Sequence, residues 1–204
     1  MTIYFYGADE VPHGCFSNFS DHGLDLDGRW WPTSEHYFQA QKFIGTRHAD
    51  LIRRARTPLR AAELGRDPSK PMRRDWERAK DDVMRRAVAA KFLTHADIRG
   101  ILLSTGDEEI VEDTTADHYW GRGRTGSGKN MLGRILMRTR GRLRAEFDEA
   151  SEARSDSGRP GRYPGKAPRR VPRPGSRGQV PGSTPTEPMY SWASASGSRT
   201  DCAQ

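Results

Sequence analysis

The chain has 204 residues, a formal net charge of +7 and an apolar fraction of 34%, which suits one folded domain with or without a tail. It has no apolar run near the ~18 residues that span a bilayer and no secretory signal at its N-terminus, so no membrane association is expected. The two cysteines, Cys15 and Cys202, lie near opposite ends; they give no support to a disulfide framework and favour a reducing cytoplasm.

Strand patterns open the chain. The run of β-branched and aromatic residues over 2–6 predicts a strand. A hairpin is predicted over 23–31, because the Asp-Gly pair at 27–28 supplies the positive φ angles of a type I′ turn. That turn would place Leu24 opposite Trp31 across the two strands.

Helical patterns dominate the rest. A helix capped by Thr33 or Ser34 is predicted to end at Gly45, and apolar residues at helical spacing predict a long helix within 71–95. The sum is a helix-rich α+β domain with a small antiparallel sheet; without regular βαβ units, a parallel nucleotide-binding sheet is not expected. The other predicted elements are helices over 48–56, 58–65, about 96–104 and about 129–148, and a strand over 108–113.

The helix after residue 33 carries the densest chemistry. Glu35, Gln39 and Lys42 are separated by four and three residues, so they share one helix face. A glutamate in a first turn can simply stabilise the helix dipole, by about 0.3–1 kcal/mol, and Lys42 can simply pair with an acid. The alternative is a desolvated acid with a raised pKa and a lysine that contacts phosphate or acts as a nucleophile. That alternative is favoured by the apolar residues around them, which are Trp30, Trp31, Tyr37, Phe38 and Phe43.

A second cluster follows the last predicted strand. The sequence "DTTADHYWGRG" (113–123) places Asp117 and Trp120 directly before a glycine-rich loop. An aromatic side chain beside an acid suits a heterocyclic base stacked next to its ribose. His118 between them is more simply interpreted as a structural histidine, and no residue spacing in the chain is typical of a metal site.

The glycine-rich loop "GRGRTGSGKN" (121–130) differs by one residue from the phosphate loop of nucleotide hydrolases. Asn130 replaces the Ser or Thr that binds Mg²⁺, and no buried apolar strand precedes the loop, so an NTPase is not expected. Gly128 and Lys129 nevertheless lie at the predicted start of a helix, where free N–H groups favour an anion. A glycine-rich connection without any ligand remains the alternative.

Composition changes near residue 150. Residues 150–204 hold eight of the 13 prolines and a net charge of +5, which leaves only +2 for residues 1–149. Such a segment cannot bury enough apolar surface to fold, so a disordered tail is predicted. A basic arm that binds nucleic acid is the sharper alternative.

Six blocks of the chain, in order between about residues 3 and 148, resemble the NADAR, or YbiA-like, family. The tail lies outside the resemblance. The blocks are "FSNF" (16–19), "WPTSEHYFQAQKF" (31–43), "GRDPSKPMRRDWE" (65–77), "VMRRAVAAKF" (83–92), "DHYWGRG" (117–123) and "GKNMLGRILM" (128–137).

The resemblance implies that residues 1–149 form a compact α+β domain that cleaves an N-glycosidic bond without a cofactor or metal. Bacterial members similar to this chain hydrolyse phosphoribosylamino-pyrimidine intermediates of riboflavin biosynthesis and release ribose 5-phosphate. Other members remove ADP-ribose from guanine in DNA. An ADP-ribosyl hydrolase acting on nucleic acid and a non-catalytic ADP-ribose or NAD-binding module therefore remain alternatives.

The resemblance also implies site residues. The family's essential glutamate falls on Glu35, its motif lysine on Lys42 and a further acid on Asp117. We expect Glu35 to act as acid and base and to stabilise a cationic sugar, with Asp117 as its partner and Lys42 adding to the sugar as an amine. The expected substrate-binding residues are Phe16, Asn18, Trp31, Arg66, Trp76, Trp120, Gly128, Lys129 and Asn130, with Phe19 as the alternative to Phe16.

Overall fold

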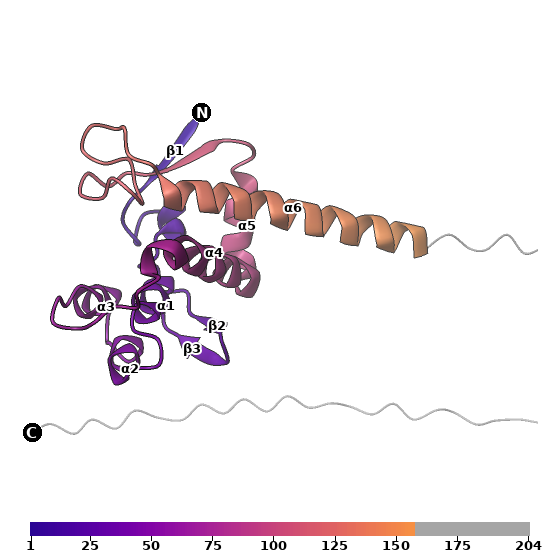
Figure 1. Ribbon diagram of the computed structural model, residues 1–204. Coiled ribbons are helices and arrows are strands. Elements are labelled where there is room, and N and C mark those ends of the chain that lie inside the picture. Colours follow the sequence, from indigo (N-terminus) through magenta and orange to yellow (C-terminus); the bar gives the residue numbers. More distant parts are fainter. Residues whose placement is uncertain (158–204) are drawn as a thin grey trace, which may run out of the picture. The chain divides into compact units, whose positions relative to one another are not determined.

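A computed structural model describes residues 1 to 157 of the protein. Helices make up most of this part (Figure 1) and confirm the predicted helix-rich α+β class. The elements in chain order are β1 (Thr2–Phe5), the 3-10 helix η1 (His13–Phe16), β2 (Leu24–Leu26), β3 (Arg29–Trp31), α1 (Ser34–Gln41), α2 (Arg47–Arg53), α3 (Pro58–Gly65), α4 (Trp76–Thr94), α5 (Ala96–Ser104), β4 (Glu109–Glu112) and α6 (Met131–Ser157).

The hairpin of β2 and β3 forms as predicted. Its turn residues Asp27 and Gly28 have φ angles of 56° and 69°, the left-handed values that a type I′ turn requires. The strands are antiparallel, and Leu24 lies opposite Trp31.

The second strand pair corrects the expectation of a purely antiparallel sheet. β1 pairs with β4 in parallel, with Thr2 opposite Glu109 and Phe5 opposite Glu112. A strand pattern in a sequence gives the faces of a strand but not its partner, and most of the domain separates these two in the chain. The pairing brings the end of β4 beside the segment that follows β1.

Helix α1 is buried on every side. All eight of its residues are buried, and it packs against α2, α3 and α4. Thr33 caps the helix by accepting a hydrogen bond from the backbone N–H of His36, as predicted. A helix in this position must carry any polar side chain into the interior, and it does so with Glu35 and Gln39.

Helices α4 and α6 each bury one stripe of apolar side chains. The stripe of α4 comprises Trp76, Val83, Met84, Ala87, Val88 and Phe92, and that of α6 comprises Leu132, Ile135, Leu136 and Leu143. Phe147, farther along α6, is 48% exposed. Its ring centre lies 5.2 Å from the guanidinium carbon of Arg99 in α5, so a cation partly covers this end of the stripe.

The predicted domain boundary at 149/150 falls inside α6, which continues to Ser157. The rest of the predicted tail, with its prolines and basic residues, lies outside the described residues. Within residues 1–157 no helix is both long and apolar enough to cross a membrane.

Candidate active site

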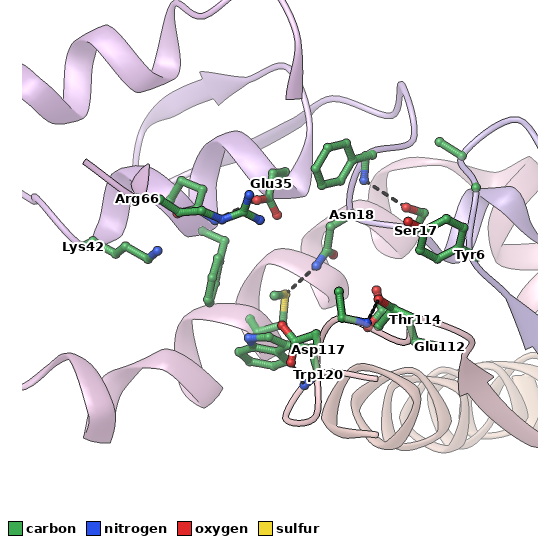
Figure 2. Close-up of a pocket in the computed structure, with 17 residues that line it drawn as sticks. Tyr6, Ser17, Asn18, Glu35, Lys42, Arg66, Glu112, Thr114, Asp117 and Trp120 are labelled. Atoms are coloured by element: carbon green, nitrogen blue, oxygen red, sulfur yellow. Dashed lines mark hydrogen bonds between the residues drawn. The ribbon is translucent and has the colours of Figure 1, made fainter. Parts of the chain in front are cut away.

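A cavity of about 730 Å³ opens between three parts of the chain. One wall comes from 6–8 and 17–19, a second from α1 with Arg66, and a third from 112–120. Figure 2 shows Lys42 and Arg66 on one side of it and Glu112 and Thr114 on the other, with Glu35 and Asn18 between them. These segments are far apart in sequence, so the cavity depends on the whole fold.

Glu35 is the buried acid of the cavity. Its side chain lines the cavity, and the residue is only 6% exposed. Burial raises the pKa of this carboxyl, while the hydrogen bond from Gln39 and the positive charge of Lys42 oppose the rise. The carboxylate is therefore desolvated, but it keeps two neighbours that favour its ionised form.

Gln39 fixes the orientation of that carboxylate. Its Nε2 donates to Glu35 Oε1 at 2.7 Å, one helical turn away. Gln39 itself lies against Gly65 at the end of α3, where an added Cβ would come within 2.0 Å of Gln39 Oε1. Gly65 is needed here for close packing, since any larger residue would displace the amide that holds Glu35.

Lys42 lies at the same side, just after α1. Its Nζ donates to the carbonyl of Gly65 at 3.1 Å and lies 5.8 Å from the ring centre of Phe38 and 5.7 Å from that of Trp76. Burial lowers the pKa of this amine, and the charge of Arg66 lowers it further, while Glu35 acts in the opposite direction. A lysine with a lowered pKa has more of the neutral amine that can act as a nucleophile.

The "FSNF" segment brings Asn18 into the cavity lining, together with Phe19. Phe16 or Phe19 was expected there: Phe19 lines the cavity, whereas Phe16 is 1% exposed and packs its ring edge against Phe5 in the core. The Asn18 carbonyl accepts a hydrogen bond from Glu35 N at 3.1 Å, so this segment is tied to the first turn of α1. The buried Oδ1 of Asn18 has no partner among the described residues, which leaves an acceptor for a ligand.

A buried lysine of α4, Lys91, also holds this segment in place. Lys91 Nζ donates to the carbonyl of Ser17 at 2.9 Å and to Ser20 Oγ at 2.6 Å. Burial lowers the pKa of Lys91 to about 7. Nothing in the sequence around Lys91 indicated this anchoring role.

Asp117 and Trp120 both reach the cavity, as expected. Asp117 Oδ1 accepts hydrogen bonds from the backbone N–H groups of Tyr119 and Trp120, each at 2.8 Å. Trp120 packs edge-to-face with Phe38, with ring centres 5.3 Å apart. Asp117 therefore shapes the turn that presents the indole and also adds negative charge to the cavity.

The structure does not bring the glycine-rich loop to the cavity: Gly128, Lys129 and Asn130 are absent from its lining. Their backbone N–H groups donate to the carbonyls of Arg122, His118 and Gly121 respectively, so none is free for an anion. A Cβ on Gly128 would lie 2.3 Å from the carbonyl oxygen of Gly121. These three N–H groups therefore do not form the expected phosphate site, and Gly128 instead allows two backbone segments to pack closely.

Two further predicted site residues lie outside the cavity lining. Trp31 is 4% exposed, donates from Nε1 to the carbonyl of Leu26 at 2.9 Å and packs edge-to-face with Tyr37. Trp76 is also buried, with its ring 5.0 Å from that of Phe38. Trp31 belongs to the core, whereas the ring of Trp76 packs beside the amine of Lys42.

Sequence reasoning missed Glu112, the last residue of β4, which lines the cavity. Burial, with the charges of Asp117 and Glu35, raises the pKa of Glu112 to about 7. The acidic run "EEIVED" offered no way to choose this residue, because only the pairing of β4 with β1 decides which acid turns inward. No cluster of three or more metal-ligating side chains occurs within residues 1–157.

The model of the NADAR domain matches residues 4–144 of the chain. The chain belongs to the NADAR family. Over 147 residues it is 52% identical to N-glycosidase Npun_R5314 of Nostoc punctiforme, a match that covers 71% of this chain and 94% of that protein. It is 49% identical over 144 residues to N-glycosidase YbiA of Escherichia coli, covering 71% and 89% of the two chains.

Two more comparisons extend this assignment. Riboflavin biosynthesis protein VVA0006 of Vibrio vulnificus is 42% identical over 143 residues, a match that covers 70% of this chain and 39% of that protein. The NMR structure of Escherichia coli YbiA is similar with a TM-score of 0.68 at 48% identity, and the match covers 73% of this chain and 88% of that one. The family predicted from the sequence blocks and its fold are therefore confirmed for this NADAR domain.

Proposed function

We propose that this NADAR protein hydrolyses the N-glycosidic bond of phosphoribosylamino-pyrimidines, the intermediates of riboflavin biosynthesis, and releases ribose 5-phosphate. The chain is a hydrolase that acts on N-glycosyl compounds, since relatives 52% and 49% identical to it are named N-glycosidases. The substrate is supported by the relative from Vibrio vulnificus, which is named for riboflavin biosynthesis.

The observation that carries the proposal is the buried carboxylate of Glu35 in a cavity it shares with Lys42. Loss of a nitrogen base from ribose passes through a cation-like state at C1′. A desolvated carboxylate stabilises that cation more strongly than an exposed one, because its charge is not screened by water. Gln39 holds the carboxylate in one orientation at 2.7 Å, so it need not reorganise as the positive charge develops.

Charge and aromatic groups suggest how the substrate lies. Arg66 is the exposed cation of the cavity lining, so we assign the 5-phosphate to it rather than to the glycine-rich loop. Trp120 and Phe19 present aromatic surface for the pyrimidine. The free Oδ1 of Asn18 suits a ribose hydroxyl, which would donate to it.

In the reaction, water attacks C1′ as the base departs, and Glu35 accepts the proton of that water. Asp117 keeps the proposed role of partner: burial is the main cause that raises the pKa of Glu35, and the negative charge of Asp117 adds to that rise and so to the basicity of Glu35. In the covalent variant of this mechanism, Lys42 adds to C1′ and water then releases the sugar. We also propose that the reaction takes place in the cytoplasm. Contact between the basic tail and nucleic acid is a further proposal.

The test compares two substrates with the full chain. Purified protein is incubated with a phosphoribosylamino-pyrimidine and, separately, with an oligonucleotide carrying ADP-ribosylated guanine. We expect ribose 5-phosphate and free pyrimidine from the first. Release of ADP-ribose from the second alone would replace the proposed substrate, and binding of ADP-ribose without any product would indicate a non-catalytic module.

Deletion of residues 158–204 sharpens the same test and leaves α6 complete. Turnover of a small substrate should not change, because residues within 1–157 form the cavity that the structure describes. A fall limited to the oligonucleotide would favour a nucleic-acid substrate held by the basic tail, since phosphate contacts dominate such binding.

A further inference from the structure

Glu112 has no part in the mechanism above, although it lines the same cavity. It is the last residue of β4, and Figure 2 shows it on the side away from Lys42 and Arg66. Its backbone is held on both sides: its N–H donates to Asn130 Oδ1 at 3.1 Å, and its carbonyl accepts from Arg122 N at 3.0 Å. The position of the carboxyl is therefore fixed by the fold.

The side chain of Glu112 is not held in this way. Its Oε2 is buried and finds no hydrogen-bond partner within residues 1–157. Glu35 differs, because Gln39 donates to it. A buried carboxylate without a donor is strongly destabilised, so such a group keeps its proton until a ligand takes it.

The charges around Glu112 act in the same direction. Asp117 and Glu35 face it as acids, and with burial they raise its pKa to about 7. β1 and α6 pack against β4, and neither contributes a charged side chain to the lining among the described residues. In the loop before α6, Arg122 pairs with Asp113, and the Nζ of Lys129 lies 5.0 Å from the ring centre of Tyr119.

We propose that Glu112 is the general acid of this site and gives its proton to the nitrogen that leaves the sugar. The inference rests on the proposed N-glycosidase function. As the bond between C1′ and nitrogen breaks, its electron pair stays on nitrogen and takes the proton of Glu112. Water forms the new bond to C1′ and gives a proton to Glu35, and exchange with solvent then restores both carboxyls.

The test uses two ribosyl 5-phosphates that differ in their leaving group. One carries an aminopyrimidine, which must be protonated, and the other carries p-nitrophenolate, which departs without a proton. We expect Glu112→Gln to lower kcat on the aminopyrimidine by about 10²-fold or more and on the nitrophenyl compound by less than about threefold. Glu109→Gln, at the exposed start of β4, is the matched control and should change neither rate.

The pH profile gives an independent readout. In the wild type, kcat/KM for the aminopyrimidine should fall as pH rises through about 7, because burial sets the pKa of the Glu112 carboxyl there and its anion cannot donate. Glu112→Gln should lose this basic limb and keep the acidic limb set by Glu35.

Each outcome decides between the two ideas. If Glu112→Gln hydrolyses the aminopyrimidine at the wild-type rate, or loses both substrates equally, Glu112 is not the general acid while the proposed function stands. If the wild-type protein releases ribose 5-phosphate from neither compound, the proposed function itself is wrong and this inference falls with it.

Discussion

The two sides of the cavity contain the same chemical group in opposite surroundings. On the side of α1, Glu35 has a donor at 2.7 Å in Gln39 and the positive charges of Lys42 and Arg66 nearby. On the side of β4, the Oε2 of Glu112 has no hydrogen-bond partner within residues 1–157, and the charges that act on its carboxyl are those of the acids Asp117 and Glu35. Burial raises the pKa of both carboxyls, but only Glu35 has neighbours that oppose the rise.

The difference shows how one cavity can hold a charge and a proton at the same time. Neighbours that favour the anion fit Glu35 to face a cationic sugar, and their absence fits Glu112 to remain a neutral acid. Two buried carboxyls with unlike surroundings are the usual means of separating base and acid roles in one site. The predictions below alter one side of the cavity at a time.

The largest effect is expected from Glu35→Gln. The amide conserves shape but removes both the negative charge and the proton acceptor, so kcat should fall by about 10³-fold. Release of ribose 5-phosphate from the aminopyrimidine substrate measures it. The control is Glu63→Gln on the exposed face of α3, and a variant at position 35 with the wild-type rate would remove Glu35 from the mechanism.

Two substitutions of Lys42, on the α1 side of the cavity, test whether its amine acts as a nucleophile or only as a positive charge. If the amine adds to C1′, Lys42→Arg and Lys42→Met should both lose about 10²-fold in kcat, because the guanidinium stays protonated. Reduction with borohydride during turnover should then attach the sugar to the wild-type protein alone, as detected by mass spectrometry. Retained activity in the arginine variant would assign Lys42 only an electrostatic role.

Gly65→Ala tests whether the orientation of Glu35 matters. The new Cβ would lie 2.0 Å from Gln39 Oε1, so Gln39 must move and its bond to Glu35 must lengthen or break. We expect kcat to fall by about tenfold with KM nearly unchanged, a loss of about 1.4 kcal/mol in transition-state stabilisation. Gly141→Ala is the control, since a Cβ there meets nothing within 4 Å.

Local patterns in the sequence predicted most of the elements and part of the site. The turn at Asp27–Gly28, the cap at Thr33 and the shared face of Glu35, Gln39 and Lys42 depend on neighbours in the chain, and spacing alone revealed them. Glu112 depends on a parallel strand pair between distant segments, which no local pattern contains.

For Glu112 the sequence missed a residue of the cavity, whereas for the glycine-rich loop it suggested a site that the hydrogen bonds do not support. The composition of the loop matched a phosphate site, but the N–H groups of Gly128, Lys129 and Asn130 donate to the backbone carbonyls of Arg122, His118 and Gly121. Glycine is compatible with both uses, because it allows a ligand or another backbone to approach equally closely. Only the hydrogen-bond partners distinguish the two, and they are not visible in a sequence.

The smallest effects compare the two candidate phosphate contacts. Arg66→Gln removes the exposed cation at the cavity and should raise KM about fivefold to tenfold with little change in kcat, because the phosphate binds equally in ground and transition states. Lys129→Gln should leave both constants unchanged, since Lys129 lies outside the cavity lining. Steady-state kinetics with the aminopyrimidine substrate measure both variants. A rise in KM for Lys129→Gln alone would return the phosphate to the glycine-rich loop and require that loop to open, because the N–H groups of Gly128, Lys129 and Asn130 all donate to backbone carbonyls in the present arrangement.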